Sequence, residues 1–231
     1  MGGYMGYFIL TGVFSLIGMF ISQRLRSKFS HYSGVPMSNG RSGAEVAADM
    51  LRHYGIHDVK IVEGQGSLTD HYNPTTKTIS LSPDVFRGRH VAAAAVAAHE
   101  CGHAVQHHQA YAWLQMRSKL VPVVSIAARA QQYLLLFALG AMGIGSNYTL
   151  LLITIAAFGA TALFSLVTLP VEFDASNRAL AWLNESGYTQ GREHEGAKDA
   201  LWWAAMTYVV AALSALVVLI YLILRLSANR N

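Results

Sequence analysis

Long stretches without a charged side chain constrain this chain more than any other feature of its sequence. Asp, Glu, Lys and Arg are absent from residues 1–23, 130–171 and 200–224. A helix needs roughly 20 apolar residues to cross a hydrocarbon core about 30 Å thick, so the first and third stretches hold one span each and the second holds two. We therefore expect about four transmembrane helices, near residues 4–22, 131–144, 148–169 and 204–224.

Two alternatives to these spans are weaker. A cleaved signal peptide would carry a basic segment before its apolar part and an Ala-x-Ala-like site after it, and residues 1–23 show neither. Buried helices of a large soluble core would need more polar residues around them than this chain has.

The second and third spans should be joined by a turn at residues 143–147, which are rich in glycine and small polar residues. An earlier start of the second span, within residues 121–128, would place Arg129 inside a helix.

Basic residues close to the span ends predict the orientation, because Lys and Arg stay on the cytoplasmic side. They cluster at both ends of residues 24–120, which we expect to be cytoplasmic in a multi-pass protein of the plasma or inner membrane. Arg225 and Arg230, after the last span, argue the other way. The formal charge of +4 fits this pattern and predicts no nucleic-acid partner. The basic residues at these ends are Arg24, Arg26, Lys28, Arg117, Lys119 and Arg129.

The polar segment 24–120 has signals for both helices and strands. Residues 42–53 should form a helix with Val46, Ala47, Met50 and Leu51 on one face. Residues 58–63 are β-branched and predict a strand. Residues 68–72 and 78–81 flank an Asn-Pro-Thr-Thr-Lys turn and predict a hairpin. A run of Ala and Val at residues 91–98 then leads into a helix. One cysteine excludes an intrachain disulfide framework.

That last helix carries the sequence His-Glu-Cys-Gly-His. Residues four apart share one helix face, so His99 and His103 can present two imidazoles to one metal ion. Glu100 lies beside that face, where its carboxylate can act on a metal-bound water. Zinc lowers the pKa of such a water to about 7, and Glu100 would accept its proton and pass it to the leaving amine. The alternative is a helix whose histidines are merely solvated.

A catalytic zinc needs a third protein ligand and one open position. Glu172, after the third span, is the candidate, because the two spans between His103 and Glu172 return the chain to the same side of the membrane. A helix-end acidic residue at the interface is the alternative. His194 and Asp174 are weaker third-ligand candidates, and Asp174 fits better as a group that orients a histidine.

We do not expect the other polar residues near the motif to bind the metal or act as the catalytic base. Arg178 could stabilise an anionic intermediate or anchor a helix. His107 lies on the same face as His103, but a third ligand two turns from His99 would strain tetrahedral geometry. We therefore expect His107 and His108 to lie near the interface or behind the ligands. We assign Cys101 no chemistry.

These motifs resemble those of the bacterial membrane neutral zinc metallopeptidases of the YugP type, over most of the chain. The resemblance implies one Zn²⁺ per chain held by His99, His103 and Glu172, with Glu100 as catalytic base. The matching segments are HYNP at residues 71–74, TISLS at 78–82, VAAHECGHAVQH at 96–107, EFDAS at 172–176 and the region 197–208.

A more remote similarity links the chain to the HtpX and CAAX-processing membrane metallopeptidases, whose third ligand lies in an ExxxD pattern. Ser176 replaces the final Asp here, which leaves open the residue that supports the zinc histidines. This similarity also implies that a strand bordering the cleft pairs with an extended substrate, through backbone hydrogen bonds. The residues of that strand would be Thr78, Ile79, Ser80 and Leu81.

The predicted fold is a mainly α membrane protein with a small α+β cytoplasmic zinc-peptidase domain. That domain carries HExxH on a helix after a short hairpin. The expected organisation is transmembrane helix 1 (residues 1–23), the motif segment (24–120), a transmembrane hairpin (121–171), a second cytoplasmic segment with the third ligand (172–199), and transmembrane helix 4 with a tail (200–231).

The predicted function is a zinc-dependent membrane endopeptidase that cleaves membrane or membrane-proximal proteins, or peptides. The alternative is a non-enzymatic adaptor in which zinc ties the polar segments together. An adaptor needs the ligands but not Glu100, so Glu100→Gln separates the two. A zinc transporter would place ionisable ligands inside the spans, and the charge-free stretches argue against it. The sequence leaves open a homo-oligomer or a membrane scaffold partner.

Overall fold

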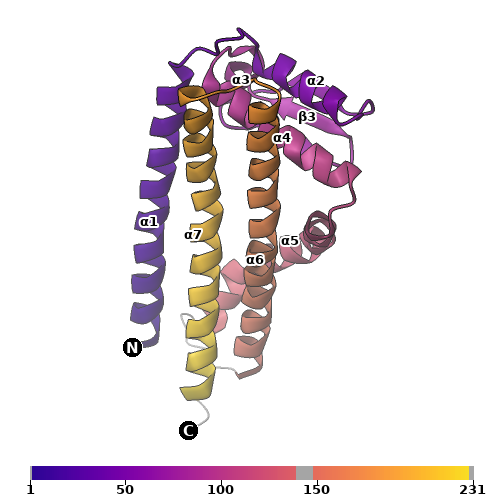
Figure 1. Ribbon diagram of the computed structural model, residues 1–231. Helices are drawn as coiled ribbons and strands as arrows, with labels where there is room; N and C mark the ends of the chain where they lie inside the picture. Colours follow the sequence, from indigo (N-terminus) through magenta and orange to yellow (C-terminus); the bar gives the residue numbers. More distant parts are fainter. Residues whose placement is uncertain (1, 139–147, 229–231) are drawn as a thin grey trace. The chain divides into compact units, whose positions relative to one another are not determined.

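The structure, a computed structural model, describes residues 2–138 and 148–228 (Figure 1). The chain divides into two compact units, one of residues 1–20, 116–169 and 207–231, and one of residues 21–115 and 170–206. The elements in chain order are α1 (Gly2–Ser33), α2 (Gly43–His53), β1 (Lys60–Glu63), β2 (His71–Asn73), β3 (Thr78–Leu81), α3 (Pro83–Arg87), α4 (Val91–His108), α5 (Ala112–Ala138), α6 (Tyr148–Glu185) and α7 (Arg192–Ala228).

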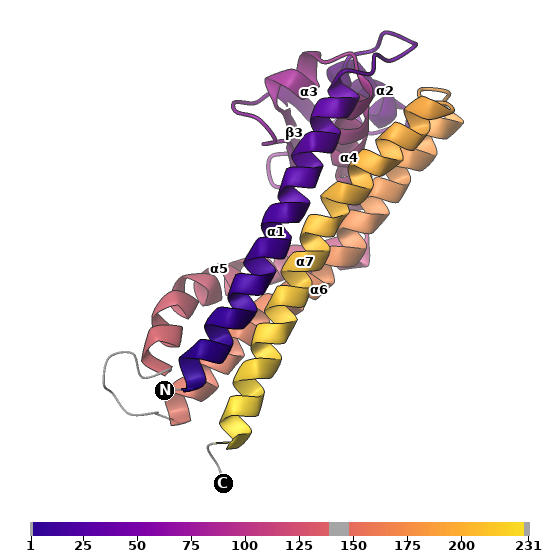
Figure 2. The ribbon, with the colours of Figure 1, turned by 90° about the vertical axis from the view of Figure 1, so that its left-hand side faces the viewer.

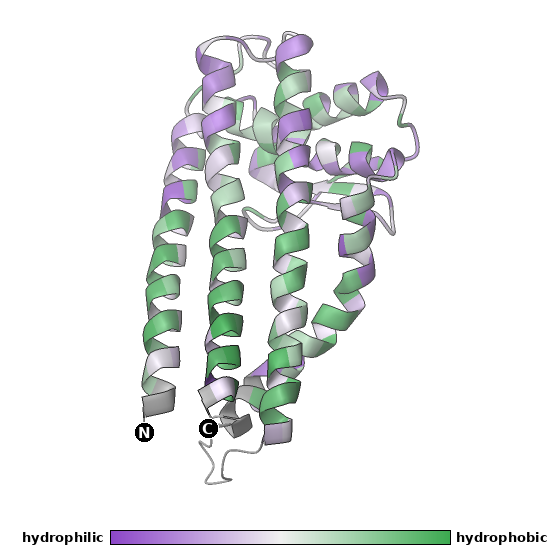
Figure 3. Cartoon of the chain, turned by 60° about the horizontal axis from the view of Figure 1, so that its bottom comes forward, coloured by the Kyte–Doolittle hydropathy of each residue, from purple (hydrophilic) through white to green (hydrophobic). Residues whose placement is uncertain are grey.

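Three helices within the described residues are long and apolar enough to cross a membrane: Met5–Ser33, Tyr148–Glu185 and Arg192–Ser227. Each is hydrophobic over one part of its length and hydrophilic over the other (Figure 3). The remaining predicted span, 131–144, falls partly on α5, and its residues 139–144 and the predicted turn at 143–147 lie outside the described residues. The α5 helix begins at Ala112, well before the predicted start of that span.

A polar contact joins α5 and α6 within the first unit. The Gln131 amide donates to the Ala157 carbonyl at 2.9 Å and to the Thr161 hydroxyl at 2.8 Å. This pair of hydrogen bonds from one side chain joins α5 to α6.

The second unit contains a three-stranded sheet in the order β1-β3-β2. The predicted hairpin is present, since β2 and β3 pair antiparallel with Tyr72 opposite Ile79. The Asn73 side chain accepts hydrogen bonds from the backbone N–H groups of Thr75 and Thr76 and so stabilises the turn. The β1 strand pairs with β3 in parallel, with Ile61 opposite Ile79.

This strand order corrects one expectation about the substrate. Thr78, Ile79, Ser80 and Leu81 form the central strand, and β1 and β2 cover its two edges. An extended peptide therefore finds no unpaired edge on β3. The reason is the parallel docking of β1, a long-range pairing that a local pattern does not reveal. The outer edges of the sheet belong to β1 and β2.

The core of this unit forms where α2 and α3 pack against α4 beside the sheet (Figure 2). The predicted face of α2 is buried, with Val46, Ala47 and Met50 fully inside. The helix begins as the pattern indicates, because Ser42 and Glu45 form a reciprocal capping box. The alanine-rich half of α4 is buried almost completely, and its small side chains allow neighbouring helices to approach closely.

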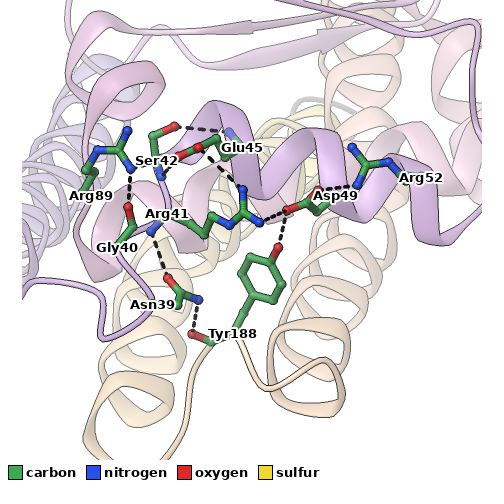
Figure 4. Close-up of polar contacts among 9 residues, drawn as sticks. All are labelled: Asn39, Gly40, Arg41, Ser42, Glu45, Asp49, Arg52, Arg89 and Tyr188. Carbon is green, nitrogen blue, oxygen red and sulfur yellow. Dashed lines mark hydrogen bonds and ion pairs between the residues drawn. The ribbon is translucent and has the colours of Figure 1, made fainter.

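A polar network fastens the segment between α6 and α7 to α2 (Figure 4). The Tyr188 carbonyl accepts a hydrogen bond from Asn39 at 3.3 Å, and the Tyr188 hydroxyl donates to Asp49. Arg52 pairs with the same Asp49 carboxylate at 2.8 Å. Burial and the neighbouring Asp49 raise the pKa of Tyr188 to about 12, so the hydroxyl stays protonated as a donor at neutral pH. The end of α6 is thereby held to the helix that packs on α4.

Candidate metal centre

The α4 helix carries the two histidines of the motif on one face. His90 caps its N-terminus by accepting a hydrogen bond from the Ala93 N–H group, and the helix continues to His108. The rings of His99 and His103 are one turn apart, with centroids 4.8 Å from each other and planes at 85°. Both imidazoles can therefore direct one nitrogen each to a common point.

Glu172 brings a carboxylate to that point from α6. Its Oε2 atom lies 3.3 Å from Nε2 of His99 and 3.6 Å from Nε2 of His103. One ligand atom from each of the three residues lies within 4.8 Å of the others. Glu172 is only 2% exposed, so its charge depends on the groups around it and not on water.

The spacing of these atoms fits a zinc ion. Two ligands at about 2.1 Å from a tetrahedral zinc lie roughly 3.4 Å apart, close to the two N···O distances observed. The donor set of two imidazoles and one carboxylate is also one that zinc uses in catalytic sites. Zinc fits the residues present, and the set leaves a fourth position for water.

The electrostatics of His103 reflect the surrounding acidic groups. Burial lowers the pKa of His103, but the hydrogen bond and charge of Glu172, the charge of Glu100 and the contact with Gln106 together raise it above its usual value. Glu100 is itself 7% exposed. The Glu100 carboxylate therefore acts on the same enclosed site as the two histidines.

Each histidine has a partner on its other ring nitrogen. Nδ1 of His99 lies 3.1 Å from the Ser176 hydroxyl, one turn beyond Glu172 in α6. Nδ1 of His103 lies 3.0 Å from the carbonyl oxygen of Gln106. Such contacts fix the ring orientation and leave Nε2 for a metal. Ser176 thus stands directly behind one of the two histidines.

Asp174 and Arg178 connect to the candidate metal ligands through other side chains. The Asp174 carboxylate reaches His103 through Gln106, whose amide donates to it at 2.8 Å. Arg178 donates to Asp174 at 2.5 Å and to the Gln109 side chain at 2.6 Å. Arg178 therefore holds Asp174 and the C-terminal end of α4 together.

Gln106 is the residue that sequence analysis missed. It is fully buried and contacts both α4 and α6. Its position three residues after His103, on the same helix face, is the signal that could have identified it. A glutamine has no charge and no metal-ligand chemistry, so the motif pattern alone gave it no weight.

The other histidines lie apart from the three-residue group. His107 faces the Tyr72 hydroxyl at 2.8 Å, and burial raises the pKa of Tyr72 to about 12. His107 and His108 line a cavity of about 220 Å³ with Tyr72, beside Ala104 of α4. His194 contacts the Thr189 hydroxyl at 3.2 Å.

Cys101 and Gly102, the variable positions of the motif, serve packing. The Cys101 thiol is buried and donates to the Ala47 carbonyl, and burial raises its pKa well above the usual value. A protonated, enclosed thiol is unreactive. A Cβ atom on Gly102 would lie 2.5 Å from the Ala175 carbonyl oxygen, so glycine permits the close approach of α4 to α6.

Comparison with known proteins places this chain in a family. Residues 7–227 match the family model described as "Putative neutral zinc metallopeptidase". The chain is 42% identical over 193 residues to a protein of Bacillus subtilis (strain 168) named "Putative membrane protease YugP", and the match covers 84% of each chain. No solved structure shows a significant match.

Proposed function

Because this chain belongs to the neutral zinc metallopeptidase family, we propose that it is a zinc-dependent membrane endopeptidase. It hydrolyses peptide bonds in membrane proteins or in segments close to the membrane. The observation that carries the proposal is the convergence of His99, His103 and Glu172 beside the buried carboxylate of Glu100. One zinc ion per chain would be held by the first three residues.

Zinc, when bound, supplies a Lewis acid that polarises the scissile carbonyl and lowers the pKa of water. The chain's own residues do the remaining work. Glu100 accepts the proton of the attacking water and then donates it to the leaving amine. Ser176 and Gln106 hold the imidazole rings in place. Because the site is enclosed, the charge of Glu100 acts on it strongly.

The substrate would reach the site from the cytoplasm. Basic residues at both ends of the motif segment support that orientation. The β2 strand offers an outer edge of the sheet and contacts α4, so it replaces β3 as the candidate for pairing with an extended peptide. Cleavage would then occur beside the membrane, where a substrate segment can be extended and accessible to water.

The test uses the full chain in lipid nanodiscs. Metal analysis should give one zinc per chain, lost in His103→Ala and kept in His194→Ala, a histidine outside the group. The wild type should cleave a membrane-anchored reporter with an unstructured juxtamembrane segment. Chelation should abolish this cleavage, and added zinc should restore it. Equal zinc content in His103→Ala and the wild type would contradict the proposal.

A further inference from the structure

The Gln106 side chain is the most buried polar group beside the metal centre. It is 0% exposed and makes three hydrogen bonds. Its carbonyl oxygen lies 3.0 Å from Nδ1 of His103. Its amide nitrogen lies 2.8 Å from the Val171 carbonyl and 2.8 Å from the Asp174 carboxylate. A polar side chain enclosed to this degree has its orientation set by its partners.

Those partners allow only one orientation of the amide. The Val171 carbonyl can only accept a hydrogen bond, and Asp174, which also accepts from Arg178, acts as a second acceptor. The NH₂ group of Gln106 must therefore face both of them. Its carbonyl oxygen is left for His103, and this oxygen can only accept.

The orientation of Gln106 in turn sets the tautomer of His103. Since the facing oxygen is an acceptor, Nδ1 of His103 must carry hydrogen, and in the neutral ring Nε2 then holds the lone pair. That Nε2 atom lies 3.6 Å from Glu172 Oε2, at the metal point. His99 differs, because the Ser176 hydroxyl at its Nδ1 can either donate or accept.

Gln106 also connects the two helices that supply the ligands. The carbonyl it binds on α6 belongs to Val171, the residue immediately before Glu172. One side chain therefore contacts a histidine ligand of α4 and the backbone beside the carboxylate ligand of α6. A shift of either helix would disturb both contacts.

We propose that Gln106 is a positioning residue that presets the metal-binding tautomer of His103 and fixes α4 against the Glu172 segment of α6. This inference rests on the proposed zinc site. It makes zinc affinity depend on a residue that touches neither metal nor substrate. Losing a partner of this kind typically weakens metal binding by about 10- to 100-fold.

The test compares Gln106→Met with the wild type, in the full chain in nanodiscs. Met keeps the volume and the unbranched shape but removes all three hydrogen bonds. Gln115→Met, at an exposed position of α5, is the control. Zinc affinity is measured by chelator competition, and the visible spectrum of the Co²⁺ form reports ligand geometry. We expect zinc binding at least about tenfold weaker and an altered Co²⁺ spectrum in Gln106→Met, with neither change in Gln115→Met.

An affinity of Gln106→Met within twofold of the wild type, with an unchanged Co²⁺ spectrum, would overturn the inference. If Gln106→Met does not fold, ¹⁵N shifts of the imidazole in the metal-free wild type decide instead, recorded at a pH high enough to keep the ring neutral. A neutral His103 with hydrogen on Nδ1 supports the inference, and hydrogen on Nε2 overturns it. Failure of the zinc site itself is distinguishable, because the wild type and His103→Ala would then bind zinc equally.

Discussion

The Nδ1 atom of His99 lies 3.1 Å from the hydroxyl of Ser176, one turn after Glu172 in α6. The same helix thus carries one candidate metal ligand, Glu172, and the hydroxyl that contacts another, His99. Ser176→Ala removes one hydrogen bond, worth about 1 kcal/mol net, so zinc affinity should fall about fivefold. Chelator competition measures the change.

Two further variants sharpen this prediction. Ser176→Asp, the residue of the ExxxD pattern, offers a charged acceptor to His99 and should bind zinc at least as tightly as the wild type. Ser67→Ala, at an exposed position of the β1–β2 connection, should have no effect. An unchanged affinity in Ser176→Ala would mean that His99 is oriented by packing alone.

Gly102 lies where α4 and α6, the helices that carry the candidate metal ligands, approach closely. In Gly102→Ala the new Cβ would lie 2.5 Å from the carbonyl oxygen of Ala175 and 3.0 Å from its Cα. Both are backbone atoms, so α4 and α6 must separate. We expect a loss of about 1–3 kcal/mol in stability and weaker zinc binding, measured by thermal unfolding and chelator competition.

Gly159→Ala is the matched control for that substitution. Gly159 is also helical, and a Cβ there would meet nothing within 4 Å. The Gly159→Ala variant should therefore unfold at or above the wild-type temperature, because Ala has a higher helix propensity than Gly. Equal behaviour of the two variants would show that the close approach at Gly102 is unimportant.

The predicted orientation can be tested with a single introduced thiol. Cys101 is the protein's one cysteine, and it is buried and should not react. In Ser67→Cys the new thiol lies on the exposed β1–β2 connection. A membrane-impermeant maleimide should label it only after the cells are permeabilised, while the wild type stays unlabelled. Labelling in intact cells would place the motif segment outside the cytoplasm.

Local patterns were enough to predict the parts of the site that lie close together in sequence. Helical spacing placed His99 and His103 on one face, and the apolar face of α2 was visible in the same way. Glu172 was predicted from the number of spans, because two spans between His103 and Glu172 return the chain to the same side of the membrane. The 3.3 Å contact between Glu172 and His99 depends on how α4 packs on α6, which the count does not give.

The features that sequence analysis missed are those set by long-range pairing. The position of β3 between β1 and β2 depends on a parallel register that no local pattern encodes. Gln106 could be placed near His103, but its two acceptors come from a distant helix. Asp174 was expected to orient a histidine, and it reaches His103 through the Gln106 side chain.

The central claim is that Glu100 performs proton transfer at a zinc site and is not needed to build it. Glu100→Gln keeps the size of the side chain but removes the base. In nanodiscs this variant should bind one zinc per chain, as the wild type does, and cleave the juxtamembrane reporter at least about 100-fold more slowly. Full zinc occupancy with unchanged cleavage by Glu100→Gln would contradict the account.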